Sequence, residues 1–365
     1  MGEDETQMAS NRPNPASPSE PTPGRPGELA PRFRAPVTRS GGPGAIRVLS
    51  VEDGELRETL GDAALAELPD LLDQRDASVW VDLTSPTPDL ALRVGAALEL
   101  HPLIVEDILE GNQRAKIETT DGQIHIVLFN LTYGERVDAA ELDFVLGEGY
   151  LLTVHDAAWD PRATNHLRSG VAPVLRHGPD HLLWALADDL VDGYFPFADR
   201  LGDAIDDVQD EVVRTASRQT VERMFLLKRE LIAVRRAVSP VREVFNQLTN
   251  RDIALISPDE LVYFRDIYDH VIRLTDELDN YRELAATTLD VYLTQVNNNL
   301  SVIMKRLTGV TVLLAGIAAI AGIFGMSEAG AALGGAEAGG FWLVTVVTIA
   351  LAVGAAFYLR RIDWI

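Results

Sequence analysis

Two long apolar segments stand close together near the C-terminal end of the chain. Residues 307–324 and residues 339–359 contain no charged side chain. Each segment has about the 20 residues that a helix needs to cross the roughly 30 Å hydrocarbon core of a bilayer. The pattern therefore predicts two transmembrane helices, over residues 307–326 and 340–359, joined by an external loop over residues 327–339.

Basic residues flank this predicted hairpin at both ends: Lys305, Arg306, Arg360 and Arg361. The linking loop holds two glutamates and no basic residue. Because basic flanks stay on the cytoplasmic side of a membrane, the sequence predicts that the N-terminus and the basic C-terminal end, residues 360–365, are both cytoplasmic. The sequence thus predicts a multi-pass protein of the inner (plasma) membrane.

The region before the hairpin begins with a tail and continues into an α/β domain. Residues 1–45 are rich in Pro, Ser and Gly, which predicts a disordered tail. Residues 46–180 mix strand and helix patterns. Strands are predicted over 78–83, 124–129, 141–146 and 150–154, with the last two forming a hairpin across Gly147-Glu148-Gly149; helices are predicted over 89–98 and 102–110.

Long amphipathic helices follow. Residues 181–257 form a predicted helical region, with one helix over 182–215 and a second over 220–247 that is bent or interrupted near Pro240. A stalk helix, residues 258–306, has no helix breaker before it enters the first span. The predicted fold class is an α+β cytoplasmic domain, followed by long stalk helices and a two-helix transmembrane hairpin.

The stalk carries an apolar stripe that needs companion helices to cover it. Its members share helical spacing: Leu274, Leu278, Leu289, Leu293 and Leu300. Two spans per chain are too few to enclose a water path, so a channel requires several copies around an axis. The sequence thus predicts a homo-oligomer held in a lipid bilayer.

Composition narrows the function. The formal net charge is −23, which argues against nucleic acid as a partner because such proteins need a basic patch. The chain has no cysteine, so disulfides and thiolate metal sites are excluded. Nothing in the sequence suggests a nucleophile–base pair or a phosphate loop, and we predict that the protein is not an enzyme.

Several blocks of sequence, in order along the chain, point to one family. They are Val79-Trp80-Val81-Asp82-Leu83, His101-Pro102-Leu103 with Glu106-Asp107, Tyr150 to His155, Tyr263 to His270, and Met304-Lys305-Arg306 leading to Gly325-Met326. With the two-span tail, they resemble the CorA family of divalent metal ion transporters, which carries a Gly-X-Asn signature after the first span.

The resemblance implies a funnel-shaped homopentamer whose first span lines the pore. It implies passive transport of Mg²⁺, with Co²⁺ or Ni²⁺ as further ions. It also implies regulatory metal sites between subunits, built from Asp107 and Asp266 with Glu106 nearby. Metal at these carboxylates would hold the pore closed, and its loss would let repulsion open the assembly. The positions that match the pore and its selective mouth are Gly325, Met326, Ser327, Ser301, Met304, Leu307, Thr311 and Ala315.

The chain departs from the family pattern inside the pore. Ser327 stands where the signature has asparagine, so the motif reads Gly-Met-Ser. A second pore asparagine, at the cytoplasmic end, corresponds to Ser301, and a proline within the first span corresponds to Gly316. These changes leave two alternatives open: a Zn²⁺-transporting relative of the same family, or a membrane-anchored cation sensor that does not conduct.

Each candidate residue also has a simpler interpretation. Glu106 and Asp107 could belong to a solvated helix face. Asp266 and His270 share a helix face at i,i+4 spacing, which suits either a transition-metal clamp or a surface pair. The basic residues at both ends of the hairpin anchor its topology, and the resemblance adds a basic collar at the pore exit. Ser301 and Ser327 could be small residues that pack helices together.

Overall fold

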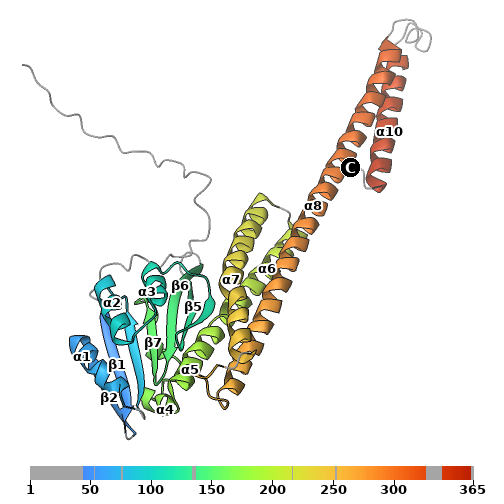
Figure 1. Ribbon diagram of the computed structural model, residues 1–365. Helices are drawn as coiled ribbons and strands as arrows, with labels where there is room; N and C mark the ends of the chain where they lie inside the picture. Colours follow the sequence, from blue (N-terminus) through green and yellow to red (C-terminus); the bar gives the residue numbers. More distant parts are fainter. Residues whose placement is uncertain are drawn as a thin grey trace, which may run out of the picture.

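The computed structural model describes residues 44–52, 54–74, 77–133, 137–215, 217–250, 253–325 and 339–362. Figure 1 shows a globular α/β body from which one long helix projects as a rod, with a second helix beside the far end of the rod. The predicted tail and external loop lie almost wholly outside the described residues.

A seven-stranded mixed sheet forms the centre of the body. Its strands are β1 (Ala45–Glu52), β2 (Glu55–Leu60), β3 (Ser78–Thr84), β4 (Lys116–Thr120), β5 (Gln123–Tyr133), β6 (Val137–Gly147) and β7 (Tyr150–His155). The spatial order is β2-β1-β3-β7-β6-β5-β4. β3 and β7 pair in parallel, and every other neighbouring pair is antiparallel.

The four strands predicted from the sequence correspond to β3, β5, β6 and β7, and the predicted hairpin is the β6–β7 pair. Three strands were not predicted: β1, β2 and β4. β2 lies at one edge of the sheet and its residues are largely exposed. An edge strand of this kind lacks the alternation of apolar and polar residues that identifies a half-buried strand.

Helices cover both faces of the sheet (Figure 1). α1 (Gly61–Leu72), α2 (Pro88–Ala97) and α3 (Pro102–Glu110) pack on one face, around a core that includes Val79, Val81 and Val145. α4 (Val171–Leu175), α5 (Pro179–Asp192) and α7 (Arg218–Asn250) cover the other face, whose core includes Trp80 and Phe144. A short 3₁₀ helix, Pro161–Ala163, precedes α4.

The start and end of α3 position the candidate metal ligands. Pro102 occupies the first turn, where its missing N–H is not needed, and the ring of His101 accepts a hydrogen bond from the Leu103 amide at 3.2 Å. Gly111 ends the helix in the left-handed region, at φ 51°, a conformation that glycine adopts at little cost. His101 therefore acts as a helix cap here.

The single helix predicted over 182–215 is wrong. The structure has two helices, α5 and α6 (Phe195–Arg214), separated at Gly193 and Tyr194. Pro196 lies in the first turn of α6, where proline is tolerated, whereas in the interior of one continuous helix it would remove a hydrogen bond.

α7, in contrast, continues through Pro240 and is not interrupted. The proline removes the hydrogen bond to the carbonyl of residue 236. Arg236 is exposed, so water can satisfy that carbonyl.

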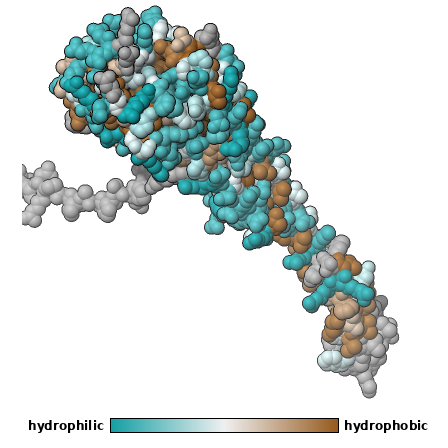
Figure 2. Space-filling model, turned by 90° about the horizontal axis from the view of Figure 1, so that it is seen from below, coloured by the Kyte–Doolittle hydropathy of each residue, from teal (hydrophilic) through white to brown (hydrophobic). Residues whose placement is uncertain are grey.

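α8 is the longest element, 65 residues from Leu261 to Gly325, and the predicted continuous helix is confirmed. At 1.5 Å per residue it is about 98 Å long. Its first part packs against α5, α6 and α7, and its last part lies beside α10 (Gly339–Arg361). Among the described residues, one helix, over Leu261–Ile323, is long and apolar enough to cross a membrane. Figure 2 shows a largely hydrophilic body and hydrophobic atoms gathered toward the far end of the rod.

Candidate metal sites and pore-lining face

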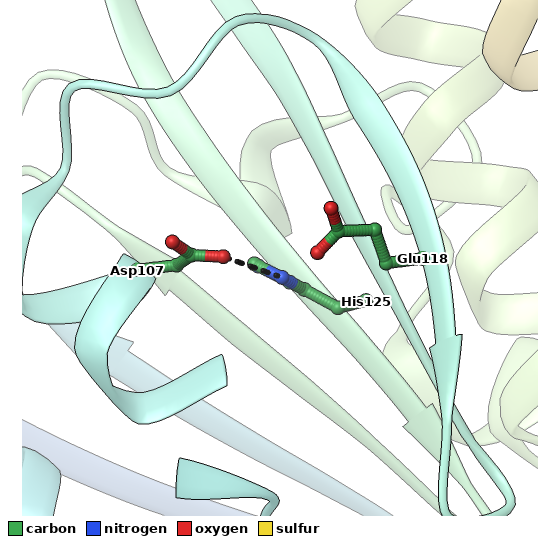
Figure 3. A group of neighbouring side chains, drawn as sticks. All are labelled: Asp107, Glu118 and His125. Carbon is green, nitrogen blue, oxygen red and sulfur yellow. Dashed lines mark ion pairs between the residues drawn. The ribbon is translucent and has the colours of Figure 1, made fainter. Parts of the chain in front are cut away.

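The first candidate metal site lies where Asp107 of α3 meets residues of β4 and β5. Asp107, Glu118 and His125 bring one ligand atom each to within 4.8 Å of one another. Figure 3 shows the three side chains converging from α3, β4 and β5. Carboxylate oxygens suit Mg²⁺, and an imidazole nitrogen adds affinity for a transition metal.

A lysine of the same chain already pairs with these carboxylates. Lys116 Nζ lies 2.6 Å from Asp107 Oδ2 and 3.0 Å from Glu118 Oε2. Burial lowers the pKa of Lys116, but the hydrogen bonds to Asp107 and Glu118 outweigh it and raise the pKa above its ordinary value. The ammonium group is therefore a charged cation at this position, and a metal ion would have to displace it to bind Asp107 and Glu118 together.

His125 lies beneath this group and is completely buried. Its Nε2 is 2.9 Å from the buried Asp143 Oδ1, and its Nδ1 is 3.9 Å from Asp107 Oδ2. A carboxylate that hydrogen-bonds to one ring nitrogen fixes the orientation of the imidazole and leaves the other nitrogen free to bind a metal. The arrangement holds His125 with one nitrogen toward Asp107.

The second candidate site joins α5 to α8. Asp188, Asp192 and His270 also place ligand atoms within 4.8 Å of one another, and His270 Nδ1 is 3.3 Å from Asp192 Oδ1. Burial, with Asp188 nearby, raises the pKa of Asp192. A cation that bound here would offset the unfavourable environment of this carboxylate.

Sequence reasoning missed Asp188 and Asp192, although their i,i+4 spacing within a predicted helix places them on one face. It did predict that Asp266 and His270 share a face. In the structure Asp266 Oδ2 is 3.9 Å from His270 Nε2, and Asp266 itself is exposed. Asp266 thus borders the second cluster.

One chain does not bring the predicted regulatory residues together. Asp107 lies on α3, which covers one face of the sheet, whereas Asp266 lies on α8, outside the helices that cover the opposite face (Figure 1). Glu106 is exposed on α3. A site that used both Asp107 and Asp266 would need two copies of the chain.

The predicted pore-lining residues share one face of α8. Ser301, Met304, Leu307, Thr311 and Ala315 are all exposed, with Met304 at 59% and Leu307 at 58%. The residues that meet α10 lie on the far side of the rod: Val312, Leu313, Gly316, Ile317 and Ile320 line a cavity of about 310 Å³ between the two helices. At about 100° per residue, the average directions of the two sets differ by about 150°, so α10 leaves most of the predicted pore face open.

Three of the predicted mouth residues stand at the end of α8 and beyond it. Gly325 is the last residue of the helix. Met326 and Ser327 lie outside the described residues. The hydroxyl groups of the remaining polar positions are engaged by the helix itself: Ser301 Oγ donates to the Asn297 carbonyl at 3.0 Å, and Thr311 Oγ1 donates to the Leu307 carbonyl at 2.7 Å.

The four basic residues lie at one end of the helical pair. Lys305 and Arg306 are exposed on α8, and Arg360 and Arg361 are exposed in the last turn of α10. Leu359 and Val312 line the same cavity, so the end of α10 comes near the turns of α8 that follow Arg306. Such a cluster suits the headgroup level of a membrane.

Comparison with known proteins agrees with this architecture. The family described as CorA-like Mg²⁺ transporter protein matches residues 75–361. The cobalt/magnesium transport protein CorA of Thermotoga maritima is 32% identical over 291 residues, covering 77% of this chain and 82% of that protein. The zinc transport protein ZntB of Yersinia pseudotuberculosis is 27% identical over 205 residues, covering 55% of this chain and 60% of that protein.

Two solved structures share the fold. The complete CorA magnesium transporter from Methanocaldococcus jannaschii has a TM-score of 0.71 at 20% identity, covering 89% of this chain and 99% of that chain. The full-length CmaX protein has a TM-score of 0.66 at 19% identity, covering 89% of this chain and 100% of that chain. The resemblance proposed from the sequence is confirmed. The separate prediction that the protein is not an enzyme is confirmed as well, because the matching family is one of transporters. The chain belongs to the CorA-like Mg²⁺ transporter protein family.

Proposed function

We propose that this protein is a passive channel or transporter for divalent cations in the inner (plasma) membrane, with Mg²⁺ as its main ion and Co²⁺ or Ni²⁺ as further ions. The observation that carries the proposal is the division of α8. Its first part belongs to the core of the folded body, and its last part is apolar, long enough to span a bilayer, and exposed on the face turned away from α10.

Several copies of the chain are needed to form the path. A single α8 has nothing to enclose water with, whereas a ring of α8 helices would bury the exposed pore face around an axis. We propose the homopentamer that the family resemblance implies, with α10 on the lipid side and both termini in the cytoplasm. The small and apolar residues along the face, such as Ala315, would let the pore close by dewetting.

Ion choice rests on the hydration of Mg²⁺. This ion gives up its inner-shell waters reluctantly, so a ring of oxygen acceptors can select it by holding those waters. We propose that Gly325, Met326 and Ser327 form the outer mouth. A serine side chain reaches less far than asparagine and leaves a wider ring, and for this reason Zn²⁺ transport is the second candidate function. The similarity to the zinc transport protein ZntB favours that alternative.

We propose that cytoplasmic metal closes the pore at Asp107 of one subunit and Asp266 of the next, with Glu106 nearby. Two carboxylates 4 Å apart repel each other by about 4 kcal/mol at an effective dielectric constant of 20. Metal loss at several subunit interfaces would therefore favour an open assembly. Inward flux is driven by the membrane potential, which contributes about 4.6 kcal/mol per 100 mV for a dication.

Flux through the reconstituted protein tests the proposal. Proteoliposomes with an inside-negative potential are expected to take up Mg²⁺, and Co²⁺ or Ni²⁺ to a lesser extent. Uptake of Zn²⁺ without Mg²⁺ would support the alternative ion. If no dication crosses while Mg²⁺ still protects the cytoplasmic body from protease, the protein is a sensor that does not conduct.

The same preparation tests the gate. The double variant Asp107→Ala with Asp266→Ala is expected to lose the protection that Mg²⁺ gives against protease, because the intersubunit site is removed. Asp259→Ala with Asp121→Ala, which changes two carboxylates outside the proposed sites, is the matched control. Unchanged protection in the Asp107 and Asp266 variant would contradict the proposed site.

A further inference from the structure

A stripe of oxygen-bearing side chains runs along α8 on the cytoplasmic side of the predicted span. Its members alternate at spacings of four and three residues, and all six are exposed: Glu283, Thr287, Asp290, Thr294, Asn297 and Ser301. In helices that wind around one another, this spacing marks the positions that face the common axis, which are normally apolar. Polar residues at every one of them fit an axis that holds water.

The stripe is continuous with the predicted pore face. The same alternation of four and three leads from Ser301 to Met304, Thr308, Thr311 and Ala315. At about 100° per residue, this face is turned on average about 130° away from the residues of α8 that line the cavity with α10. In a ring of α8 helices, the stripe would therefore extend the path from the membrane into the cytoplasmic rod.

Each hydroxyl group of the stripe donates its proton to a backbone carbonyl of the same helix, so only its lone pairs are available to other partners. Thr287 Oγ1 donates to the Glu283 carbonyl at 3.0 Å, and Thr294 Oγ1 donates to the Asp290 carbonyl at 2.9 Å. Ser301 does the same to Asn297 at 3.0 Å. Each hydroxyl oxygen can then only accept a further hydrogen bond. The waters around a dication turn their hydrogens outward, so a surface of acceptors suits a hydrated cation.

Asn297 has the one carboxamide side chain in this stripe. We infer that Asn297, one helical turn below Ser301, supplies the ring of amide oxygens that holds the hydrated dication at the cytoplasmic end of the path. This inference rests on the proposed function. Ser301 is short, and its proton is bound to the Asn297 carbonyl, whereas Asn297 reaches further and offers a stronger acceptor about 6 Å closer to the cytoplasm.

The neighbouring asparagines supply matched controls. Asn298 and Asn299 follow Asn297 directly and are also exposed. At about 100° per residue, Asn298 is turned to the flank of the rod and Asn299 to the side away from the stripe. The three residues have the same side chain and lie at nearly the same height along the rod, and they differ in the side of the helix that they face.

Mg²⁺ uptake into proteoliposomes is the first test. Asn297→Ala is expected to raise the Mg²⁺ concentration for half-maximal uptake about tenfold, since tenfold corresponds to about 1.4 kcal/mol, close to one hydrogen bond. Asn299→Ala is expected to behave as the unchanged protein does. Equal values for the two variants would overturn the role of Asn297 while leaving the proposed function intact. An unchanged protein that takes up no dication would overturn both.

Introduced thiols give a second test that does not depend on flux. Because the chain has no cysteine, Asn297→Cys and Asn299→Cys each contain a single thiol. Mild oxidation of the membrane-embedded protein is expected to link copies of Asn297→Cys through disulfides and to leave Asn299→Cys unlinked. The reverse pattern, or equal linking, would show that Asn297 does not face the axis. Size-exclusion chromatography before oxidation confirms that both variants are assembled alike.

Discussion

The two halves of α8 are built for different surroundings. In the first half, Phe264, Ile267, Val271, Leu274 and Leu278 are completely buried against the helices of the same chain. In the second half, large apolar residues at similar spacing are exposed: Leu293 is 52% exposed and Leu300 is 53% exposed. One end of the helix therefore belongs to the core of the folded body, and the other end exposes large apolar residues.

The contrast separates folding from assembly. A single chain can bury the first half by itself, and the free energy of folding depends on that burial. The second half packs against α10 on one side. Its remaining apolar residues, which include Leu293 and Leu300, can gain partners only from further copies or from lipid, and an exposed apolar face of this kind marks an interaction surface. Substitutions in the first half should therefore change the free energy of unfolding, and substitutions in the second half should change the stability of the oligomer.

The largest effect is expected from Phe264→Ala. The ring is completely buried in the core between α8 and its neighbours, and truncation of a buried aromatic residue costs about 3–5 kcal/mol. Denaturant unfolding of the full chain in detergent, followed by far-UV circular dichroism, measures the loss. A loss below about 1 kcal/mol would mean that the first half of α8 is not part of the folded core.

A smaller effect, dependent on pH, is expected at Lys116. Its pKa in the folded protein lies above the ordinary 10.5. The folded state thus binds this proton more tightly than the unfolded state, so the contribution to stability is complete below pH 10.5 and is lost as pH rises through the folded-state pKa. Lys116→Met should lower the free energy of unfolding by about 1–2 kcal/mol at neutral pH and flatten its decline above pH 10.5.

The control for this prediction is Lys228→Met. Lys228 is an exposed residue of α7, and its loss should leave both the free energy of unfolding and its pH dependence as they are. Identical pH profiles for the two lysine variants would contradict the role assigned to the contact between Lys116 and Asp107.

The smallest effect on folding is expected from Leu300→Ala. More than half of this side chain is exposed in the single chain, and surface substitutions usually change stability by less than about 0.5 kcal/mol. Unfolding measured as for Phe264→Ala should therefore be almost unchanged, whereas the oligomer seen by native mass spectrometry should dissociate more readily. A variant that lost folding stability but assembled normally would contradict the claim that the second half of α8 contributes to assembly and not to folding.

Much of the architecture could be predicted because its signals are local. The long rod could be predicted from a stretch without helix breakers, and the strands β3, β5, β6 and β7 from their apolar runs. β2 and β4 are largely exposed or half-buried and show no clear buried pattern, whereas β1 carried a local signal in its buried apolar residues that was missed. The division between α5 and α6 carried a local signal, Gly193 with Pro196, that the amphipathic pattern on both sides concealed.

The candidate sites were harder to predict from the sequence than the fold, because they depend on contacts between elements that are distant along the chain. The sequence named Asp107, but nothing in it showed that Lys116 on β4 would supply an internal cation or that His125 would lie below, backed by Asp143. The cluster of Asp188, Asp192 and His270 needs α5 and α8 to lie side by side. Only the spacing within each helix could be seen in advance.

The unbroken course of α8 has a mechanical consequence. From Tyr292, which still packs against α6 and α7, to Ile323 the helix extends about 47 Å at 1.5 Å per residue. As a stiff lever, it would turn a rotation of the body by about 5° into a displacement of about 4 Å at its tip. A displacement of that size exceeds the diameter of a water molecule, so slight leaning of the bodies could open or shut an aperture far away, with no hinge inside the shaft.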